Sequence, residues 1–325
     1  LSNGCVVNRP ITITNNTKIW DGSQGTSTWN DPENWSPSGI PTANNCVIIR
    51  DVGALPNPEI LGPPLPPTPS YGRNLTVKNH GNLELQPSTS LTVTDWIHVD
   101  PNGTIDVRNN ANLVQITNVA TNNNTGSINM YREITGLTAQ DYVYWASAVE
   151  NFAVGGVSPG TNASYVLNWR PTVGGNGTGN YGDWQATGEN MIPGKGYAIR
   201  ALSGTSIANT AHFTGKSSNG IINMPINRGS YNGINYPGAG VTVATAIDDN
   251  WNLVGNPFPS SIFADDFIIM NAANISDDTN PAIAGTVYLW SHSSAPSNVV
   301  TDPFYGDYVY NYNPNNYIAY NLTGS

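Results

Sequence analysis

The chain has 325 residues, of which only 10% are charged, and its 12 basic and 22 acidic side chains give a formal net charge of −10. A chain of this length favours two domains over one. So few cations cannot neutralise many phosphates, which argues against nucleic acid and anionic membranes as partners. No apolar run approaches the roughly 20 residues that a membrane-spanning helix needs.

The polar surface of this chain is built from uncharged residues. Charged residues make up roughly a quarter of an ordinary globular protein. In this chain Asn, Thr, Ser and Gly take their places. This substitution suits strands stacked in register, because identical charges on successive rungs would repel each other whereas Asn and Thr ladders can form hydrogen bonds. The composition therefore favours an all-β fold.

Residues 1–45 contain Trp20, Trp29 and Trp35 in a segment rich in Gly and Pro. A stack of strands has an open apolar end that must be shielded, and three tryptophans can shield it. We expect this segment to be a cap. The alternative is a stacking platform for sugar rings, since indole faces also suit pyranoses.

Short apolar strands separated by turn residues follow the cap, and from Leu75 onward they recur about every eight residues. That spacing is too short for βαβ units and predicts a parallel β-helix, which together with the cap spans residues 1–130. Residues 55–72 are rich in proline, which cannot donate to a β-ladder. We expect this stretch to leave the solenoid. The predicted strands are Val47–Ile49, Leu75–Val77, Leu83–Leu85, Leu91–Val93, Ile97–Val99, Ile105–Val107 and Leu113–Ile116.

The strands become longer and more aromatic from Ser127 onward. In the segment Tyr142–Trp145 both faces carry bulky side chains, as expected for a strand covered on two sides. We predict that residues 131–325 form an antiparallel β-sandwich with jelly-roll-like character.

The stretch Asp248–Ile262 reads DDNWNLVGNPFPSSI. Trp251 and Leu253 alternate with smaller residues, which predicts a short strand with these two side chains in the sandwich core. Pro257 ends the strand because it lacks an N–H, and Phe258 is held between two prolines. These residues are expected to be structural.

A short helix is predicted over residues 263–271. Ser260 or Ser261 could cap it. Asp265 and Asp266 would lie in its first turns, where the helix dipole favours acidic side chains.

Several motifs resemble those of one family in the same order along the chain. WNLVGNPFPSSI (residues 251–262) resembles the NLVGNPYPSAI signature of large secreted surface proteins of Bacteroidetes that are exported by type IX secretion. Further matches are DYVYWASAV (141–149), MIPGKGYAIR (191–200), FTGKSSNGII (213–222) and GTVYLWSH (285–292). The resemblance implies an extracellular or cell-surface location and an adhesin-like or structural module.

The same resemblance implies the type IX secretion machinery as a partner and a sorting region outside this chain. The type IX secretion machinery would recognise a sorting region that is not seen in this chain, so the full protein is expected to continue beyond Ser325. Cys5 and Cys46 are the only cysteines. In the extracellular setting they suggest one disulfide, with two free buried thiols as the alternative.

The search for catalytic chemistry is largely negative. The four histidines are scattered and form no metal-ligand pair, and Gly194–Gly196 lacks the pattern of a phosphate loop, so it is expected to be a tight turn before a strand. The acidic pairs Asp248–Asp249, Asp265–Asp266 and Asp277–Asp278 follow no EF-hand spacing and leave only a structural Ca²⁺ open. We predict no catalytic, cofactor or metal residues.

A β-helix also raises the possibility of a polysaccharide lyase, which needs cations to neutralise uronate carboxylates. Arg50, Arg73, Lys78 and Arg108 show no rung-to-rung repeat, so this interpretation is minor. Carbohydrate binding through exposed aromatics, notably the Tyr-rich segment Tyr305–Tyr320, is more credible, although that segment could equally form further sandwich strands.

The sequence thus predicts a non-enzymatic extracellular surface or adhesin-like module that presents a rigid β-scaffold. Glycans or other surface proteins are its possible partners. The alternative is a carbohydrate-binding module of a polysaccharide-processing surface protein.

Overall fold

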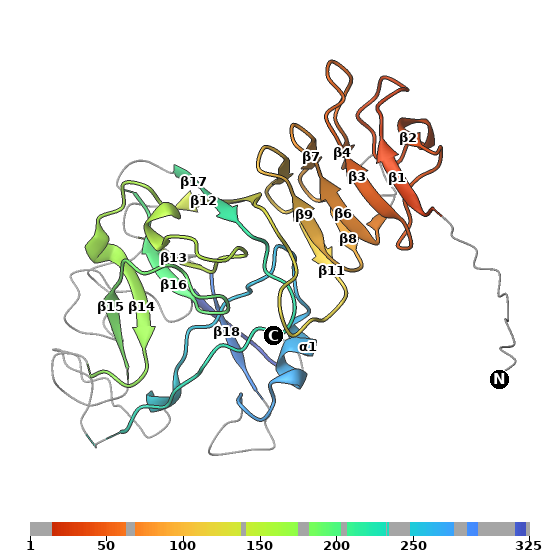
Figure 1. Ribbon diagram of the computed structural model, residues 1–325. Coiled ribbons are helices and arrows are strands. Elements are labelled where there is room, and N and C mark those ends of the chain that lie inside the picture. The colour runs from red at the N-terminus through yellow and green to blue at the C-terminus, as the bar shows by residue number, and fades with distance from the viewer. Residues whose placement is uncertain are drawn as a thin grey trace, which may run out of the picture.

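A computed structural model of the chain (Figure 1) describes residues 15–62, 69–137, 141–174, 182–202, 207–231, 233, 248–275, 285–291 and 316–322. The described residues are nearly all β, as predicted. A parallel β-helix occupies the N-terminal part and antiparallel sheets follow it.

The β-helix makes about three turns. Each turn contributes one short strand to each of three sheets, and strands of successive turns pair in parallel. The strands of the first part are β1 (Thr17–Trp20), β2 (Trp35–Ser36), β3 (Cys46–Ile49), β4 (Glu59–Ile60), β5 (Ser70–Gly72), β6 (Asn74–Val77), β7 (Asn82–Leu85), β8 (Ser90–Val93), β9 (Ile97–Val99), β10 (Thr104–Val107) and β11 (Asn112–Gln115).

Apolar side chains stack in register inside the β-helix. Val47, Leu75 and Ile97 follow one another on successive turns of one sheet, and each is at most 1% exposed. Leu91 and Leu113 stack in the same way on another sheet. The predicted alternation of inward apolar and outward polar residues therefore holds, and it creates a continuous core along the solenoid axis.

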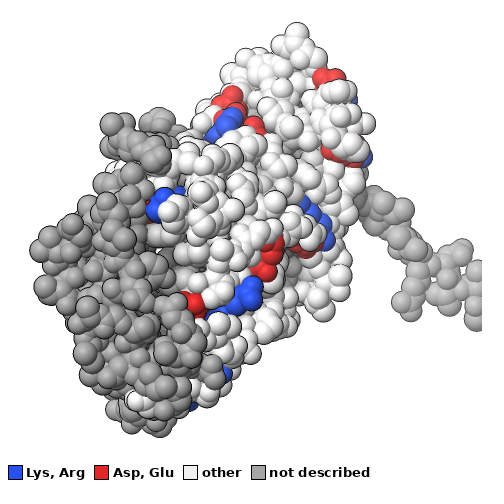
Figure 2. Space-filling view, turned by 90° about the vertical axis from the view of Figure 1, so that its left-hand side faces the viewer, with Lys and Arg blue, Asp and Glu red and all other residues white. Residues whose placement is uncertain are grey.

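Arg73, Lys78 and Arg108 of the solenoid face carboxylates on neighbouring turns. Arg73 contacts Asp95 at 3.1 Å and Arg108 contacts Glu84 at 2.6 Å. Figure 2 shows the result on one face of the molecule: charged side chains lie in small groups of both signs, separated by uncharged surface. Because these three cations are already paired with carboxylates, they do not favour uronate binding on the solenoid.

The three tryptophans of the N-terminal segment form the cap that the sequence predicts. Trp20, Trp29 and Trp35 are at most 2% exposed. Trp35 meets the other two edge-on, with ring centroids 5.1 and 4.8 Å apart, and its indole N–H donates to the carbonyl of Trp29 at 2.8 Å. A short 3₁₀ helix, Pro32–Asn34, lies between Trp29 and Trp35. Burial of these rings excludes the sugar-stacking alternative for them.

The excursion predicted over residues 55–72 is narrower than expected. β4 and β5 lie within that range and pair with β7 and β8. They can do so because they contain no proline. Residues 63–68, which hold several of the prolines, lie outside the described residues.

β12 (Ile128–Leu137) joins the solenoid to the antiparallel part. It pairs in parallel with β10 and antiparallel with β17 (Ile207–Gly215), so the predicted domain boundary at residue 130 falls inside one strand. Gly126 precedes β12 with φ +77°, and a Cβ there would lie 1.9 Å from the carbonyl oxygen of Val99. Only glycine permits this close approach and this backbone conformation.

A second sheet contains β13 (Tyr142–Trp145), β16 (Tyr197–Arg200), β14 (Val166–Arg170) and β15 (Asp183–Ala186), in that order, all antiparallel. Trp145 of this sheet packs against Phe213 of β17 with ring centroids 6.2 Å apart. β18 (Val287–Trp290) and β19 (Tyr317–Tyr320) form a separate antiparallel pair. Within the predicted Tyr-rich segment, the described residues therefore include a strand.

The described part of the chain contains one α-helix, α1 (Ala264–Met270), close to the predicted position. Asp265 and Asp266 lie in its first turn as expected, but Phe263 occupies the N-cap position and no side chain caps it. The predicted serine cap is wrong, because Ser261 is bound elsewhere (below). No helix among the residues described here is long and apolar enough to cross a membrane.

The proposed disulfide stays a prediction. Cys46 is a half-buried free thiol that accepts a 3.6 Å hydrogen bond from Asn74, and Cys5 lies outside the described residues. If the two pair in the secreted protein, the denatured chain should take up no iodoacetamide until it is reduced, and mass spectrometry would detect this. Labelling of both thiols without reductant would exclude the bond.

Replacing Trp29 by Ala should destabilise the chain by about 3–5 kcal/mol, because it opens a cavity in the cap. Trp96 is a matched control, since it is 37% exposed on the outer surface of the same solenoid, and its replacement should change stability by no more than about 0.5 kcal/mol. Denaturant unfolding of the two variants measures both effects. Equal losses would show that the three rings do not act as a cap.

Candidate functional site

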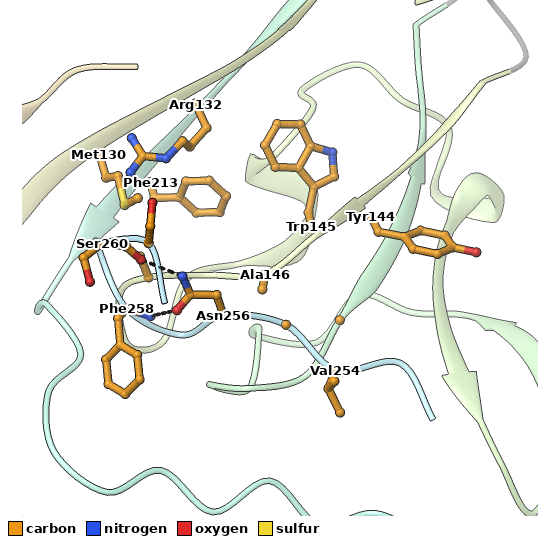
Figure 3. Close-up of a pocket in the computed structure, with 14 residues that line it drawn as sticks. Met130, Arg132, Tyr144, Trp145, Ala146, Phe213, Val254, Asn256, Phe258 and Ser260 are labelled. Atoms are coloured by element: carbon orange, nitrogen blue, oxygen red, sulfur yellow. Dashed lines mark hydrogen bonds between the residues drawn. The ribbon is translucent and has the colours of Figure 1, made fainter. Parts of the chain in front are cut away.

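A cavity of about 310 Å³ lies where the β-helix meets the antiparallel part. β12 and β17 supply Met130, Arg132 and Phe213 on one side, and β13 supplies Trp145 (Figure 3). The other side is formed by residues 254–261, which come from the stretch that carries the family signature.

Backbone contacts hold the signature stretch against its neighbours. Leu253 accepts a hydrogen bond from Gly196 N, and Gly255 N donates to the carbonyl of Gly194, both at 3.0 Å. A Cβ on Gly255 would lie 2.3 Å from Cβ of Ala146, so a glycine is needed at this crossing. The predicted tight turn at Gly194–Gly196 therefore serves as a docking point for this stretch.

The side chain of Asn256 shapes the next turn. Its Oδ1 accepts from the backbone N–H of Phe258 at 3.0 Å, and its Nδ2 donates to the carbonyl of Ser260 at 2.6 Å (Figure 3). An Asn followed by two spaced prolines thus encodes a closed loop.

This loop attaches to the last turn of the β-helix. Leu113 N donates to the carbonyl of Pro259 at 2.8 Å. The Oδ1 of Asn112 accepts from both the backbone N–H and the hydroxyl of Ser261, at 2.8 and 3.1 Å. The hydroxyl predicted to cap a helix is therefore used to bind β11.

The structural residues predicted in this stretch have different surroundings. Trp251 is 37% exposed, so the prediction of a core side chain is wrong. Leu253 is half-buried against Gly196, Pro257 is buried, and Phe258 is half-buried and lines the cavity. The predicted strand is reduced to a single bridge between Val254 and Lys195, because backbone attachment at Gly255 and Pro259 takes the place of a ladder.

Arg132 is the cation of the cavity. Its guanidinium donates to the carbonyls of Arg108, Tyr131 and Ala111 at 3.1, 2.8 and 2.9 Å. Among the described residues no carboxylate lies within ion-pair distance of it. Burial lowers the pKa of Arg132 to about 10, so the side chain remains charged at neutral pH.

Trp145 forms the aromatic wall of the cavity. It is 6% exposed, and its indole nitrogen is buried without a hydrogen-bond partner. A buried donor in this state is uncommon in native proteins. The sequence analysis did not identify Arg132 or Trp145 as site residues. Arg132 could have been found, because it is a cation at an inward position of the alternating segment Met130–Ile134.

A second group of aromatic side chains lies on the opposite face of the sheet that contains β13. Tyr144 alternates with Trp145 along the strand, and Figure 3 shows its ring at the border of the cavity, pointing away from Arg132. Its ring lies 6.0 Å from that of Trp290 and its hydroxyl is 2.6 Å from that of Tyr317. At the edge of this group Trp251 and Tyr288 meet edge-on at 5.0 Å, and both are exposed.

Two residues of the acidic pairs bind other protein groups: Asp265 accepts from the hydroxyl of Tyr320 at 2.7 Å, and Asp249 binds Arg228 at 2.8 Å. Asp249 is buried and also binds the backbone N–H of Tyr231 at 2.9 Å. Asp277 and Asp278 lie outside the described residues. No group of three or more potential metal ligands occurs in the part of the chain that is described.

The two tryptophans at positions 145 and 251 should respond differently to truncation. Trp145→Ala should cost about 3–5 kcal/mol because the ring is buried, whereas Trp251→Ala mainly loses an edge-on contact of about 0.5–1.5 kcal/mol. Urea unfolding of both variants compares them. A larger loss for Trp251→Ala would contradict the exposed position of its ring.

Comparison with known proteins gives one match. No curated protein and no solved structure matches the chain, but the family model described as "Domain of unknown function (DUF8693)" matches residues 19–325. The match runs through the tryptophan cap, the β-helix and the antiparallel sheets. The chain therefore belongs to the DUF8693 family.

Proposed function

We propose that this chain is a non-enzymatic extracellular or cell-surface module, adhesin-like in kind, that presents a rigid β-scaffold after export by type IX secretion. The observation that carries the proposal is the sheet β17-β12-β10-β7-β4, which runs from the solenoid into the antiparallel part. A spacer that must hold a binding surface away from a cell needs such a joint, because a flexible linker would let the two parts reorient.

Other contacts at the same junction support rigidity. Asn124 is 3% exposed, and its side chain accepts from Ile97 N at 2.9 Å while donating to the carbonyl of Ser217 at 3.0 Å. Asn122 donates to the same carbonyl at 2.8 Å. Ser217 follows β17, so the side-chain amides of Asn122 and Asn124 tie the third turn of the solenoid to the antiparallel part.

The low charge of the surface and the order of the five motifs support the role of a secreted scaffold. The low charge content and the cross-turn ion pairs leave few free cations for an enzymatic site on the solenoid. The five motifs that resemble type IX secretion substrates include the stretch that closes the end of the solenoid. Secretion, the surface location and partners among glycans or other surface proteins all belong to the proposal.

A second candidate is a carbohydrate-binding module. The exposed pair Trp251 and Tyr288 favours it, since aromatic faces stack on sugar rings. Trp251 is 37% exposed, so part of its ring is accessible for such stacking. This pair, rather than the Tyr-rich segment as a whole, is the place where such binding would occur.

Localisation and shape test the scaffold proposal. An antibody raised against the purified chain should label intact cells of the source bacterium, and the labelling should vanish when type IX export is disabled. Small-angle X-ray scattering of the purified chain should fit one rigid shape for the described parts. Failure to label wild-type cells, or scattering that requires independent motion of the solenoid and the antiparallel part, would contradict it.

A glycan array separates the two candidates. Under the scaffold proposal the chain shows no glycan retention that depends on Trp251. If Trp251→Ala keeps its thermal stability but loses retention of a defined glycan, the carbohydrate-binding function replaces the scaffold as the main role.

A further inference from the structure

We infer that the cavity beside Arg132 binds a small organic carboxylate whose body is a single ring. This ligand site is independent of the scaffold proposal, because a rigid module needs no ligand there. It is also distinct from the exposed pair Trp251 and Tyr288, which lies on the other face of the sheet that contains β13.

The fixed guanidinium of Arg132 is the first argument. Three of its N–H groups are used by backbone carbonyls, and an arginine has five. The guanidinium is therefore held in one orientation while it keeps donor capacity. Planar paired donors of this kind match the two oxygens of a carboxylate.

The contrast with other arginines is the second argument. Arg73, Arg108 and Arg228 each contact a carboxylate between 2.6 and 3.1 Å. Arg132 is more enclosed than an ordinary surface cation, and no carboxylate from the described chain reaches it. Burying a charge without an opposite charge is costly, and the lowered pKa of Arg132 reflects this cost. A ligand carboxylate would supply the missing partner.

The cavity walls define the rest of the ligand. Trp145 and Phe213 provide aromatic surface. Ser260 adds a hydroxyl that has no hydrogen-bond partner among the described residues. A volume of about 310 Å³ is at the lower end of ligand pockets, which suits one ring with a carboxylate.

A sugar acid and an aromatic acid share this chemistry, so the test includes both. The indole N–H resonance of Trp145, assigned with Trp145→Phe, is followed by NMR while sodium galacturonate or sodium benzoate is added. Galactose and acetate are the control ligands, because the first has the ring without the carboxylate and the second has the carboxylate without the ring. We expect a saturable shift with at least one of the two acids and none with either control. The acid that binds more tightly identifies the source of the carboxylate.

Two pairs of variants test the role of Arg132. Arg132→Gln removes the charge and Arg132→Lys keeps the charge without the planar fork, and both should weaken binding at least tenfold. Because Arg132 also supports three carbonyls, these variants could fail to fold, so a second pair leaves it in place. Ser260→Asp puts a competing carboxylate on the cavity wall and should also weaken binding at least tenfold, whereas the uncharged Ser260→Asn should bind within about twofold of the parent chain.

Three outcomes would overturn the inference. They are the absence of a saturable shift with either acid, equal binding of galactose and galacturonate, and binding by folded Ser260→Asp that matches folded Ser260→Asn. In each case Arg132 would serve only to satisfy the carbonyls of residues 108, 111 and 131. Thermal melts of every variant show which of them are folded.

Discussion

A β-helix buries its apolar side chains between successive turns, so its first and last turns expose apolar surface unless something covers them. This chain covers its two ends in different ways. At the N-terminal end a contiguous segment folds three indoles over the stack. At the C-terminal end the cover comes from segments far apart in sequence, namely β12 and the loop of residues 256–261. The rest of the fold depends on this second cover, because it is also the joint to the antiparallel part.

The need to cover the last turn explains why the signature stretch is built from Gly, Asn, Pro and Ser. Its attachment uses backbone atoms and short polar side chains: the carbonyl of Pro259 continues the ladder of β11, and Ser261 binds Asn112. Prolines suit an edge that accepts hydrogen bonds without donating them. Large side chains are not needed for this attachment, so Trp251 is left at the surface.

The low charge content suggested that the solenoid avoids like charges on successive turns, but one sheet carries a column of carboxylates. Glu59, Glu84 and Asp106 stand in register on one sheet of the solenoid. Arg108 contacts both Glu84 and Asp106, at 2.6 and 3.5 Å, while Gln86 donates to Glu59 at 3.1 Å. The neighbouring column of side chains thus supplies donors to the acidic column. The scarcity of charge in this chain therefore does not require that every column avoid carboxylates.

Features set by local periodicity could be predicted from the sequence, and features set by distant contacts could not. Alternating apolar triplets predict the rungs because each inward residue is followed by an outward one. The same rule was wrong for Trp251, where alternation over four residues predicted a strand. Among the described residues, the pairing of this stretch is limited to the bridge between Val254 and Lys195. The helix cap failed for a similar reason, since the hydroxyl of Ser261 has a better partner in Asn112, 149 residues away in the sequence.

The cavity follows from the way the two parts meet. Arg132 occupies an inward position of β12 just beyond the last turn, where a leucine would continue the solenoid core. The carbonyls of residues 108 and 111 lie between β10 and β11 of that turn and accept the N–H groups of Arg132. An apolar residue would leave these carbonyls without this donor, whereas the guanidinium satisfies them. The space that remains between the guanidinium, Trp145 and Ser260 is the consequence. The residue that binds these carbonyls is thereby also the one that gives the cavity its charge.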